Sequence, residues 1–175
     1  MKNKNIKRRS FLKATATASI AYSAFPSPAI SKNRLRWKMV TTWPKNFPGV
    51  GTTAEKIAQS INKASDGRLE IKVYGAGEIV PAYEVFDAVR QGTAEMGHGW
   101  SGYWISKNPG LAYFGGIPGG LSPSEQSAWA LYGGGLELWE ELLDPYGIQP
   151  FQGGIVQTEM FGWYKKALNS TEDLK

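Results

Sequence analysis

The strongest constraint on the fold is an alternation of strand-like and helix-like patterns between residues 35 and 100. Patterns typical of strands cover 35–42, 69–73 and 94–100, and apolar residues at helical spacing cover 52–65 and 85–89. Strands that alternate with helices through short connections favour right-handed crossovers and a parallel sheet. We therefore predict an α/β fold, a doubly wound β-α-β-α-β lobe with its first strand in the middle of the sheet.

After residue 100 the pattern changes to an aromatic, glycine-rich stretch and then to helices. Ser122 and Glu125 match a capping box, which predicts a helix that reaches about Tyr132. A second helix is predicted over 136–143 and a fourth strand over 148–151. The pattern of a second βαβ unit does not follow, so we expect either a small single domain or, as the preferred interpretation, an incomplete two-lobed fold.

A basic leader precedes the body of the chain. Arg8 and Arg9 stand one residue before Phe11-Leu12-Lys13, which resembles a twin-arginine export signal. A weakly apolar stretch follows, and Ser27-Pro28-Ala29 supplies the small residues of a cleavage site. We predict a signal peptide over 1–29, a mature domain over 30–175, the twin-arginine translocase as a partner and the periplasm as the location.

The charge of the chain is divided between this leader and the body. Residues 1–35 hold eight basic residues and no acidic one, so the remaining 12 basic and 15 acidic residues give the body a net charge of −3. A protein that binds nucleic acid needs basic residues gathered on its folded part. We therefore expect no nucleic-acid partner.

Composition narrows the function classes further. Cysteine is absent and histidine occurs once, at His98, which excludes thiol nucleophiles and multi-histidine metal sites. The sequence holds no nucleophile elbow to which His98 could serve as a base, so a structural role near a pocket floor is the favoured interpretation. Seven Trp, eight Tyr and seven Phe favour a binding domain. We predict that the protein is not an enzyme and carries no prosthetic group.

A ligand site is expected at one edge of the sheet. In open α/β sheets ligands bind beyond the carboxyl ends of the strands, and the amino end of a helix there suits an anion. The segments after the predicted strands carry the aromatic residues Trp43, Trp100, Tyr103 and Trp104. They are candidates for the walls of a small apolar pocket, although core packing is the competing interpretation for each of them taken singly.

A second function class comes from a glycine motif. Gly49-Val50-Gly51-Thr52-Thr53-Ala54 matches the dinucleotide fingerprint G-x-G-x-x-A and opens a helix after a strand. It indicates, as the alternative, an exported nucleotide-dependent oxidoreductase. The fingerprint requires a tight turn directly after the strand, whereas residues 43–48 intervene here, and Glu70 lies in the middle of its strand rather than at its end.

Three further motifs carry a family resemblance. Thr41-Thr42-Trp43-Pro44, Ala94-Glu95-Met96-Gly97-His98-Gly99 and the run 159–166 (Glu-Met-Phe-Gly-Trp-Tyr-Lys-Lys) resemble the solute-binding subunits of TRAP transporters. These subunits form the DctP family, and the likeness is nearest to its TakP-like α-keto acid binders. It spans residues 35–175, and the order and spacing of the motifs make it specific.

The resemblance implies a periplasmic binding protein whose two lobes close on an organic acid. In TakP-like members the acid is a 2-oxo acid such as pyruvate, held with a cation, Na⁺ or Ca²⁺. The loaded protein delivers it to integral-membrane permease subunits, and a homodimer is among the assemblies the resemblance allows. The family's substrate-clamping arginine falls by register just past Lys175, so the resemblance is to the N-terminal portion only.

The resemblance also implies the site residues. A glutamine in a Q-M-x-G-W motif helps to bind metal and substrate in the family, and this chain has Glu159 at the matching position with Gln157 two residues before it. Glu159 and Gln157 are accordingly the expected metal ligands. The expected substrate-binding residues are Trp43, Trp100, Gln157, Glu159 and Trp163.

The leader generates the first prediction. Replacing Arg8 and Arg9 together with lysine keeps the positive charge but removes the guanidinium pair that the export signal requires. The precursor should then remain in the cytoplasm, as measured by cell fractionation and immunoblotting. An unchanged periplasmic yield would show that export does not depend on the arginine pair.

Overall fold

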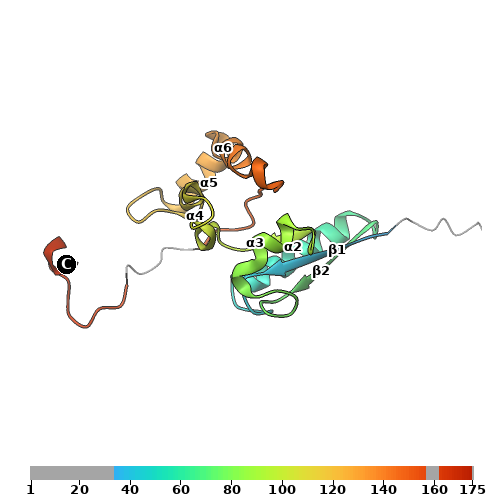
Figure 1. Ribbon diagram of the computed structural model, residues 1–175, viewed down its shortest axis with the longest axis horizontal. Coiled ribbons are helices and arrows are strands. Elements are labelled where there is room, and N and C mark those ends of the chain that lie inside the picture. The colour runs from blue at the N-terminus through green and yellow to red at the C-terminus, as the bar shows by residue number, and fades with distance from the viewer. Residues whose placement is uncertain (1–33, 157–161, 175) are drawn as a thin grey trace, which may run out of the picture. The chain divides into compact units, whose positions relative to one another are not determined.

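A three-stranded parallel sheet is the framework of the fold in our computed structural model, which describes residues 34–156 and 162–174 (Figure 1). Strand β1 (Leu35–Thr41) lies between β2 (Leu69–Tyr74) and β3 (Met96–His98), in the order β2-β1-β3. Both pairings are parallel. The predicted topology is confirmed, whereas the predicted signal peptide over 1–29 lies outside the described residues.

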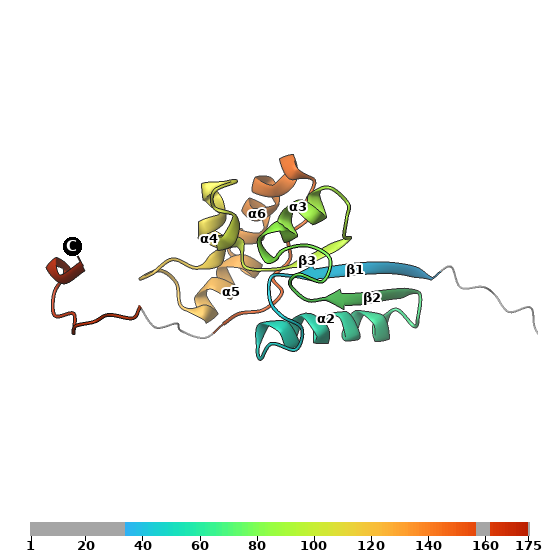
Figure 2. The same cartoon turned by 60° about the horizontal axis from the view of Figure 1, so that its bottom comes forward.

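One face of the sheet is covered by helix α2 (Val50–Ala64), as Figure 2 shows. Ala54 and Ala58 lie one turn apart and are almost fully buried, because their small side chains let the helix approach the sheet closely. Asn62 then fixes the helix to β2: its side chain accepts from the amide of Ile71 at 2.6 Å and donates to the carbonyl of Ile71 at 3.0 Å. The buried core on this face consists of Met39, Ala54, Ala58, Ile71 and Val73.

The opposite face is covered by helix α3 (Val85–Arg90), and the helical segment that follows β3 packs against the same buried cluster. That segment consists of η3 (Ser101–Trp104), η4 (Pro109–Leu111), α4 (Ala112–Gly115), α5 (Pro123–Tyr132), α6 (Gly135–Leu143) and η5 (Asp144–Tyr146). The buried core on this face consists of Val40, Val85, Phe86, Ala88, Ala94, Trp104, Leu111 and Leu143. Two short 3₁₀ helices, η2 (Ala82–Glu84) and η6 (Thr171–Leu174), complete the described structure.

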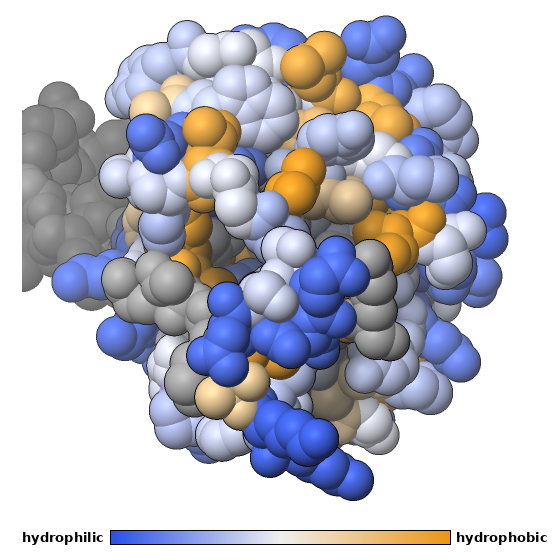
Figure 3. Space-filling model, turned by 90° about the vertical axis from the view of Figure 1, so that its left-hand side faces the viewer, coloured by the Kyte–Doolittle hydropathy of each residue, from blue (hydrophilic) through white to orange (hydrophobic). Residues whose placement is uncertain are grey.

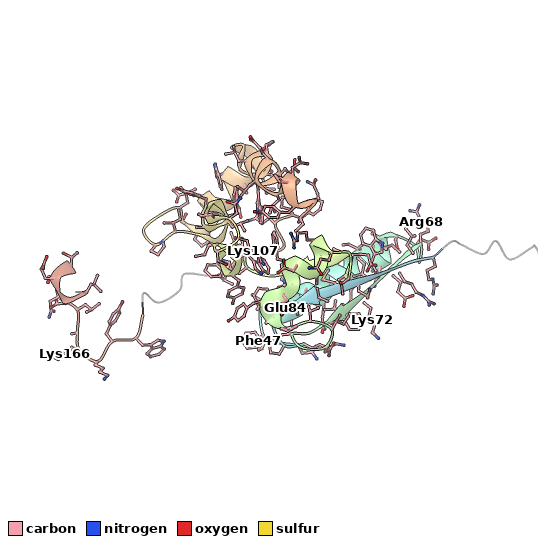
Figure 4. All side chains as sticks on the ribbon, viewed as in Figure 1. Phe47, Arg68, Lys72, Glu84, Lys107 and Lys166 are labelled. Carbon is pink, nitrogen blue, oxygen red and sulfur yellow. The ribbon has the colours of Figure 1, made fainter. Side chains whose placement is uncertain are left out.

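The helical segment is also tied to α3 at the surface. The ammonium of Lys107, labelled in Figure 4, lies 2.6 Å from the carboxylate of Asp87 and 5.9 Å from the centre of the Phe86 ring. A partly exposed ion pair of this kind contributes about 1 kcal/mol or less to stability. The buried side chains therefore account for most of the packing between the segment and α3.

The third strand is shorter than predicted, because only Met96–His98 of the expected 94–100 form it. The amides of Thr93 and Ala94 both donate to the carbonyl of Ala88, which keeps this stretch at the end of α3. The amide of Lys38 on β1 donates to the carboxylate of Glu95 at 2.7 Å instead of to a neighbouring strand. This hydrogen bond is the main cause that lowers the pKa of Glu95.

The prediction of a fourth strand over 148–151 is wrong. Residues 148–151 form no strand, and the sheet of the described residues has three members. Pro150 has no amide to donate to a ladder, and the side chain of Gln149 donates to Glu140 on α6. The alternation of apolar residues here reflects packing of Ile148 against the helical segment rather than strand pairing.

The two helices predicted after residue 120 are confirmed. Ser122 caps α5 with a complete capping box, in which its hydroxyl accepts from the amide of Glu125 while the Glu125 carboxylate accepts from the Ser122 amide. Gly134, with a φ of 84°, separates α5 from α6 in the left-handed conformation that favours glycine. None of the helices in the described part of the chain has the length and apolar character needed to cross a membrane.

The exposed apolar side chains are dispersed on the one face of the molecule that Figure 3 draws. On the face drawn in Figure 3, apolar areas are separated from one another by hydrophilic side chains. The most exposed large apolar residues of the helical segment are Tyr132, Tyr113, Leu131 and Leu138. Single exposed apolar residues are normal on protein surfaces and do not by themselves mark a binding face.

The close contact between β3 and α3 generates the second prediction. A Cβ atom on Gly97 would lie 2.9 Å from a methyl of Val85 and 3.0 Å from a methyl of Val89. Gly97→Ala should therefore lower the free energy of unfolding by about 1–3 kcal/mol, measured by urea denaturation. The control is Gln59→Ala on the exposed face of α2, which should change it by no more than about 0.5 kcal/mol. Equal stability of the two variants would contradict this packing.

Candidate functional site

The carboxyl ends of β1 and β3 bring Trp43 and His98 together. Thr41 is the last residue of β1 and pairs with His98, the last residue of β3. The indole N–H of Trp43 donates to Nδ1 of His98 at 3.0 Å, and the two rings meet edge to face with their centres 5.4 Å apart. The loop that follows β1 is thus held against the end of β3 by a side-chain hydrogen bond.

The second ring nitrogen of His98 faces the chain at Gly153. The distance from Nε2 to the carbonyl oxygen of Gly153 is 3.5 Å, and a Cβ atom on Gly153 would lie 3.0 Å from Nε2. Because Nδ1 accepts from Trp43, the proton of a neutral imidazole must sit on Nε2 and point toward Gly153. Both ring nitrogens are therefore used within the fold, which agrees with the structural role expected of His98.

Burial lowers the pKa of His98 below its ordinary value of 6.5, and the bond to the Gly153 carbonyl raises it in part. Protonation of Nδ1 would also set a second N–H against the indole N–H of Trp43. The geometry and the direction of the pKa shift thus agree that His98 is neutral near pH 7.

The threonines at the end of β1 fix the start of the loop. The hydroxyl of Thr41 donates to the carbonyl of Trp43 at 2.7 Å and approaches that of Tyr74 at 3.3 Å. The amide of Thr42 donates to the carbonyl of His98 at 3.1 Å. The hydroxyls of Thr42 and Ser101, in contrast, are buried with no hydrogen-bond partner in the described structure. A buried hydroxyl without a partner costs about 1–3 kcal/mol.

Trp100 lies on the loop that leaves β3. Its indole N–H donates to the carbonyl of Gly115 at 2.7 Å, its ring meets that of Tyr103 edge to face, and 45% of the residue is exposed. A Cβ atom on Gly102 would lie 2.4 Å from the ring, so glycine is required there. Trp43 and Trp100 therefore project from the ends of neighbouring strands with their N–H groups bonded inside the fold.

Trp104 is not a pocket wall, contrary to the sequence prediction. It is 8% exposed, packs against Phe86 in the core, and donates its N–H to the carbonyl of Tyr83 at 2.8 Å. Tyr103 is 38% exposed and bridges Trp100 and Tyr83 by two edge-to-face contacts. Trp104 is therefore a core residue, whereas Tyr103 lies partly at the surface.

The remaining predicted site residues lie toward the end of the chain. Gln157 and Glu159 fall outside the described residues, and Trp163 is 90% exposed. Sequence reasoning missed Gly115 and Gly153, the backbone partners of Trp100 and His98. No local pattern marks them, because each meets its partner through a loop far along the chain.

Two amides at the amino end of α2 are bonded within the chain. The amide of Thr53 donates to the carbonyl of Gly49 at 2.9 Å, and the amide of Thr52 donates to that of Phe47 at 3.1 Å. A Cβ atom on Gly51 would lie 2.8 Å from the carbonyl oxygen of Pro44, so this glycine serves loop packing. The glycine spacing of 49–54 thus has an explanation in packing, and the dinucleotide alternative is not supported by the relatives reported below.

An open pocket of about 510 Å³ lies elsewhere, against α6 and η5. The carboxylates that line it are those of Glu137, Glu140, Glu141 and Asp144. We do not take it as the site, because among the described residues no three acidic or histidine side chains converge as cation ligands. The predicted interpretation of 140–144 as a solvated helix face stands.

Comparison with known proteins identifies the family. The sequence model described as bacterial extracellular solute-binding protein, family 7 (DctP), matches residues 39–175. The chain belongs to this family. A monocarboxylate 2-oxoacid-binding periplasmic protein from a Nostoc species is 34% identical over 177 residues, which cover 100% of this chain and 48% of that protein.

Two solved structures extend the comparison. A TRAP periplasmic solute binding protein from Colwellia psychrerythraea, with bound calcium and pyruvate, is 42% identical with a TM-score of 0.77. One from Pseudoalteromonas atlantica, with bound sodium and pyruvate, is 41% identical with the same TM-score of 0.77. The match covers 81% of this chain and 43% of each of those chains. This chain thus spans less than half the length of the Nostoc, Colwellia and Pseudoalteromonas proteins.

The comparisons settle the general class. The expected family and the α/β periplasmic-binding-protein fold are confirmed, and the relatives are binding proteins of the periplasm rather than enzymes. The chain therefore shares its family with these periplasmic proteins. Its solved relatives hold a cation and a small acid, the two ligands expected here in place of a prosthetic group.

The buried imidazole generates the third prediction. Because the folded-state pKa of His98 lies below its unfolded value near 6.5, the unfolded chain takes up the proton first as the pH falls. The free energy of unfolding should therefore decrease as the pH drops through 6.5 and level off below the folded-state pKa. Urea denaturation from about pH 8 to about pH 5 measures this, with His98→Asn as the control that lacks the titrating group. Parallel pH profiles for the two proteins would contradict it.

Proposed function

We propose that this chain acts in the substrate-binding subunit of a TRAP-type secondary transporter. Such a subunit captures a small organic acid in the periplasm and delivers it to integral-membrane permease subunits. The observation that carries the proposal is the 41–42% identity to two TRAP solute binding proteins that hold pyruvate. We infer that residues 30–175 are the N-terminal portion of the solute-binding domain, with lobe 1 and the start of the crossover to lobe 2.

The substrate class follows from the same relatives. Pyruvate is bound in both solved relatives, and the Nostoc relative is named for monocarboxylate 2-oxo acids. A 2-oxo acid presents a carboxylate beside a carbonyl oxygen, so it offers two hard oxygen atoms to one cation. We propose a small 2-oxo acid such as pyruvate as the substrate.

A cation has a clear electrostatic task in this proposal. Glu159 and the substrate are both carboxylates, and two like charges in a closed site of low dielectric repel each other strongly. Ca²⁺ or Na⁺ placed between them converts the repulsion into two attractions. The donor set fits this task, because the carboxylate of Glu159 and the amide oxygen of Gln157 are the hard oxygen ligands such ions prefer.

The aromatic residues have a different task. The indole N–H groups of Trp43 and Trp100 already donate to His98 and Gly115, so these side chains can offer ring faces and edges but no hydrogen-bond donors to an acid. Together with Trp163 they are proposed to form the apolar wall of the cleft. Such a wall excludes water and strengthens the electrostatic contacts inside the closed site.

Two further expectations belong to this proposal. The leader over 1–29 is proposed to be a twin-arginine signal peptide. The twin-arginine translocase is proposed to recognise it through Arg8 and Arg9. A homodimer remains a prediction, which light scattering on the purified protein would decide.

The proposal generates the fourth prediction. In a protein that continues past Lys175 to the second lobe, Glu159→Ala should weaken pyruvate binding by about ten- to hundredfold, because it removes a charged ligand of the bridging cation. Titration calorimetry measures the affinity with added calcium and after treatment with a chelator. The chelator should weaken binding by the wild type more than binding by the variant.

The matched control is Glu141→Ala, which removes an exposed carboxylate from α6. It should bind pyruvate like the wild type, with the same dependence on calcium. Equal affinity of the wild type and Glu159→Ala, with and without chelator, would remove Glu159 from the site. Absence of pyruvate binding by the wild type would overturn the proposed substrate.

A further inference from the structure

His98 joins three segments that are distant in sequence. It ends β3, it receives the indole of Trp43 from the loop after β1, and it faces Gly153 in the chain that follows the helical segment. Trp43 and Gly153 each lie 55 residues from it. Four residues beyond Gly153 the chain reaches Gln157, the first of the proposed cation ligands.

We propose that His98 is a positioning residue of the candidate site, whose imidazole holds the Trp43 indole at Nδ1 and the backbone of Gly153 at Nε2. The consequence is that the backbone at Gly153 is held beside the end of β3, at the ring that also receives Trp43. This inference rests on the proposed function, because only that function makes the region a ligand site. The two contacts themselves can be tested without any ligand.

The chemistry of the two contacts selects histidine. One neighbour is a donor, the indole N–H, and the other is an acceptor, the backbone carbonyl, so the residue between them needs an acceptor on one side and a donor on the other. Neutral imidazole supplies both on one rigid ring. Asparagine can supply the acceptor near the Nδ1 position, and glutamine can supply the donor near the Nε2 position, but neither supplies both.

The approach of the chain to the ring also requires a small residue. A Cβ atom on Gly153 would stand 3.0 Å from both Cδ2 and Nε2 of the imidazole. An alanine there would push the backbone and the ring apart by several tenths of an ångström. Gly153→Ala therefore disturbs the Nε2 contact while it leaves His98 and the Trp43 contact in place.

Protonation acts on one contact and spares the other. It adds an N–H at Nδ1 against the indole N–H of Trp43, while the Nε2–H that faces Gly153 remains. The two groups bonded to the ring are uncharged, and the causes of the pKa shift are burial and the Gly153 carbonyl, without a charged neighbour from β1, α2 or the chain at 149–154. The imidazole itself is therefore the group whose titration moves Trp43.

The first measurement follows the Trp43 indole N–H by NMR in the 175-residue chain, without acid or cation. Its resonance is identified by its loss in Trp43→Phe. In the wild type it should shift with pH as His98 titrates. In His98→Asn it should keep its bonded position and show no such titration, and in His98→Gln it should shift toward the value of a free indole.

The second measurement follows chymotrypsin cleavage after Phe151, which is exposed and lies two residues before Gly153. One hydrogen bond contributes about a factor of five to the local opening equilibrium. Cleavage should therefore become about fivefold faster in His98→Asn and in Gly153→Ala, and stay near the wild-type rate in His98→Gln. Cleavage after Tyr132, which is 89% exposed between α5 and α6, is the internal control and should not change.

The expected result is thus crossed: asparagine keeps the indole contact and frees Gly153, whereas glutamine does the reverse. Identical behaviour of the two variants, or wild-type behaviour of both, would overturn the proposal. If neither His98 variant folds, Trp43→Phe and Gly153→Ala decide, since faster cleavage after Phe151 in Gly153→Ala alone is required. A pyruvate and calcium titration of the extended wild type separately decides the proposed function, because its failure leaves the crossed pattern intact.

Discussion

The central position of β1, whose carboxyl half is buried on both faces, is the constraint on which the rest of the structure depends. Met39 and Val40 are adjacent, point to opposite faces, and are each 1% exposed, so each core receives one of them. Because β1 pairs with both neighbours, its last residue is fixed against His98 of β3. The loop that carries Trp43 must therefore begin beside His98. The geometry of the site is a consequence of strand pairing and not of the loop's own preferences.

The sequence predicts this framework well because its signals are local. The strand patterns over 35–42 and 69–73, the capping box at Ser122 and the apolar stripe of α2 each act within a few residues. All four elements are confirmed, with the strands at Leu35–Thr41 and Leu69–Tyr74. The errors arise where a tertiary contact replaces a local one. Lys38 gives its amide to Glu95, which shortens β3, and the missing amide of Pro150 leaves the predicted fourth strand without a ladder.

The residues of the candidate site also fall into those that the sequence predicts and those that it does not. The topology rule for open sheets places Trp43 and Trp100 at the carboxyl edge, and the structure agrees. The topology rule does not reveal Gly115 or Gly153. Their carbonyls meet the Trp100 indole and the His98 imidazole, which lie 15 and 55 residues away in the sequence. The proposed roles of Gln157 and Glu159 rest on family resemblance alone. The glycines of 49–54 matched a nucleotide motif, yet Gly51 is required by the carbonyl of Pro44, which shows that one spacing can serve two physical purposes.

The internal use of the indole N–H groups has a further consequence for binding. A wall whose donors are already bonded cannot compensate the charge of a carboxylate, and the body of this chain carries a net charge of −3. Compensation must then come from the cation and from residues beyond those described. Aromatic faces contribute roughly the same contact to any small acid of similar shape, whereas a cation binds a 2-oxo acid through two oxygens and a simple carboxylate less favourably. In the proposed site, discrimination between acids therefore rests on the cation and its ligands, and the rigid aromatic wall determines chiefly the size of the acid that can enter.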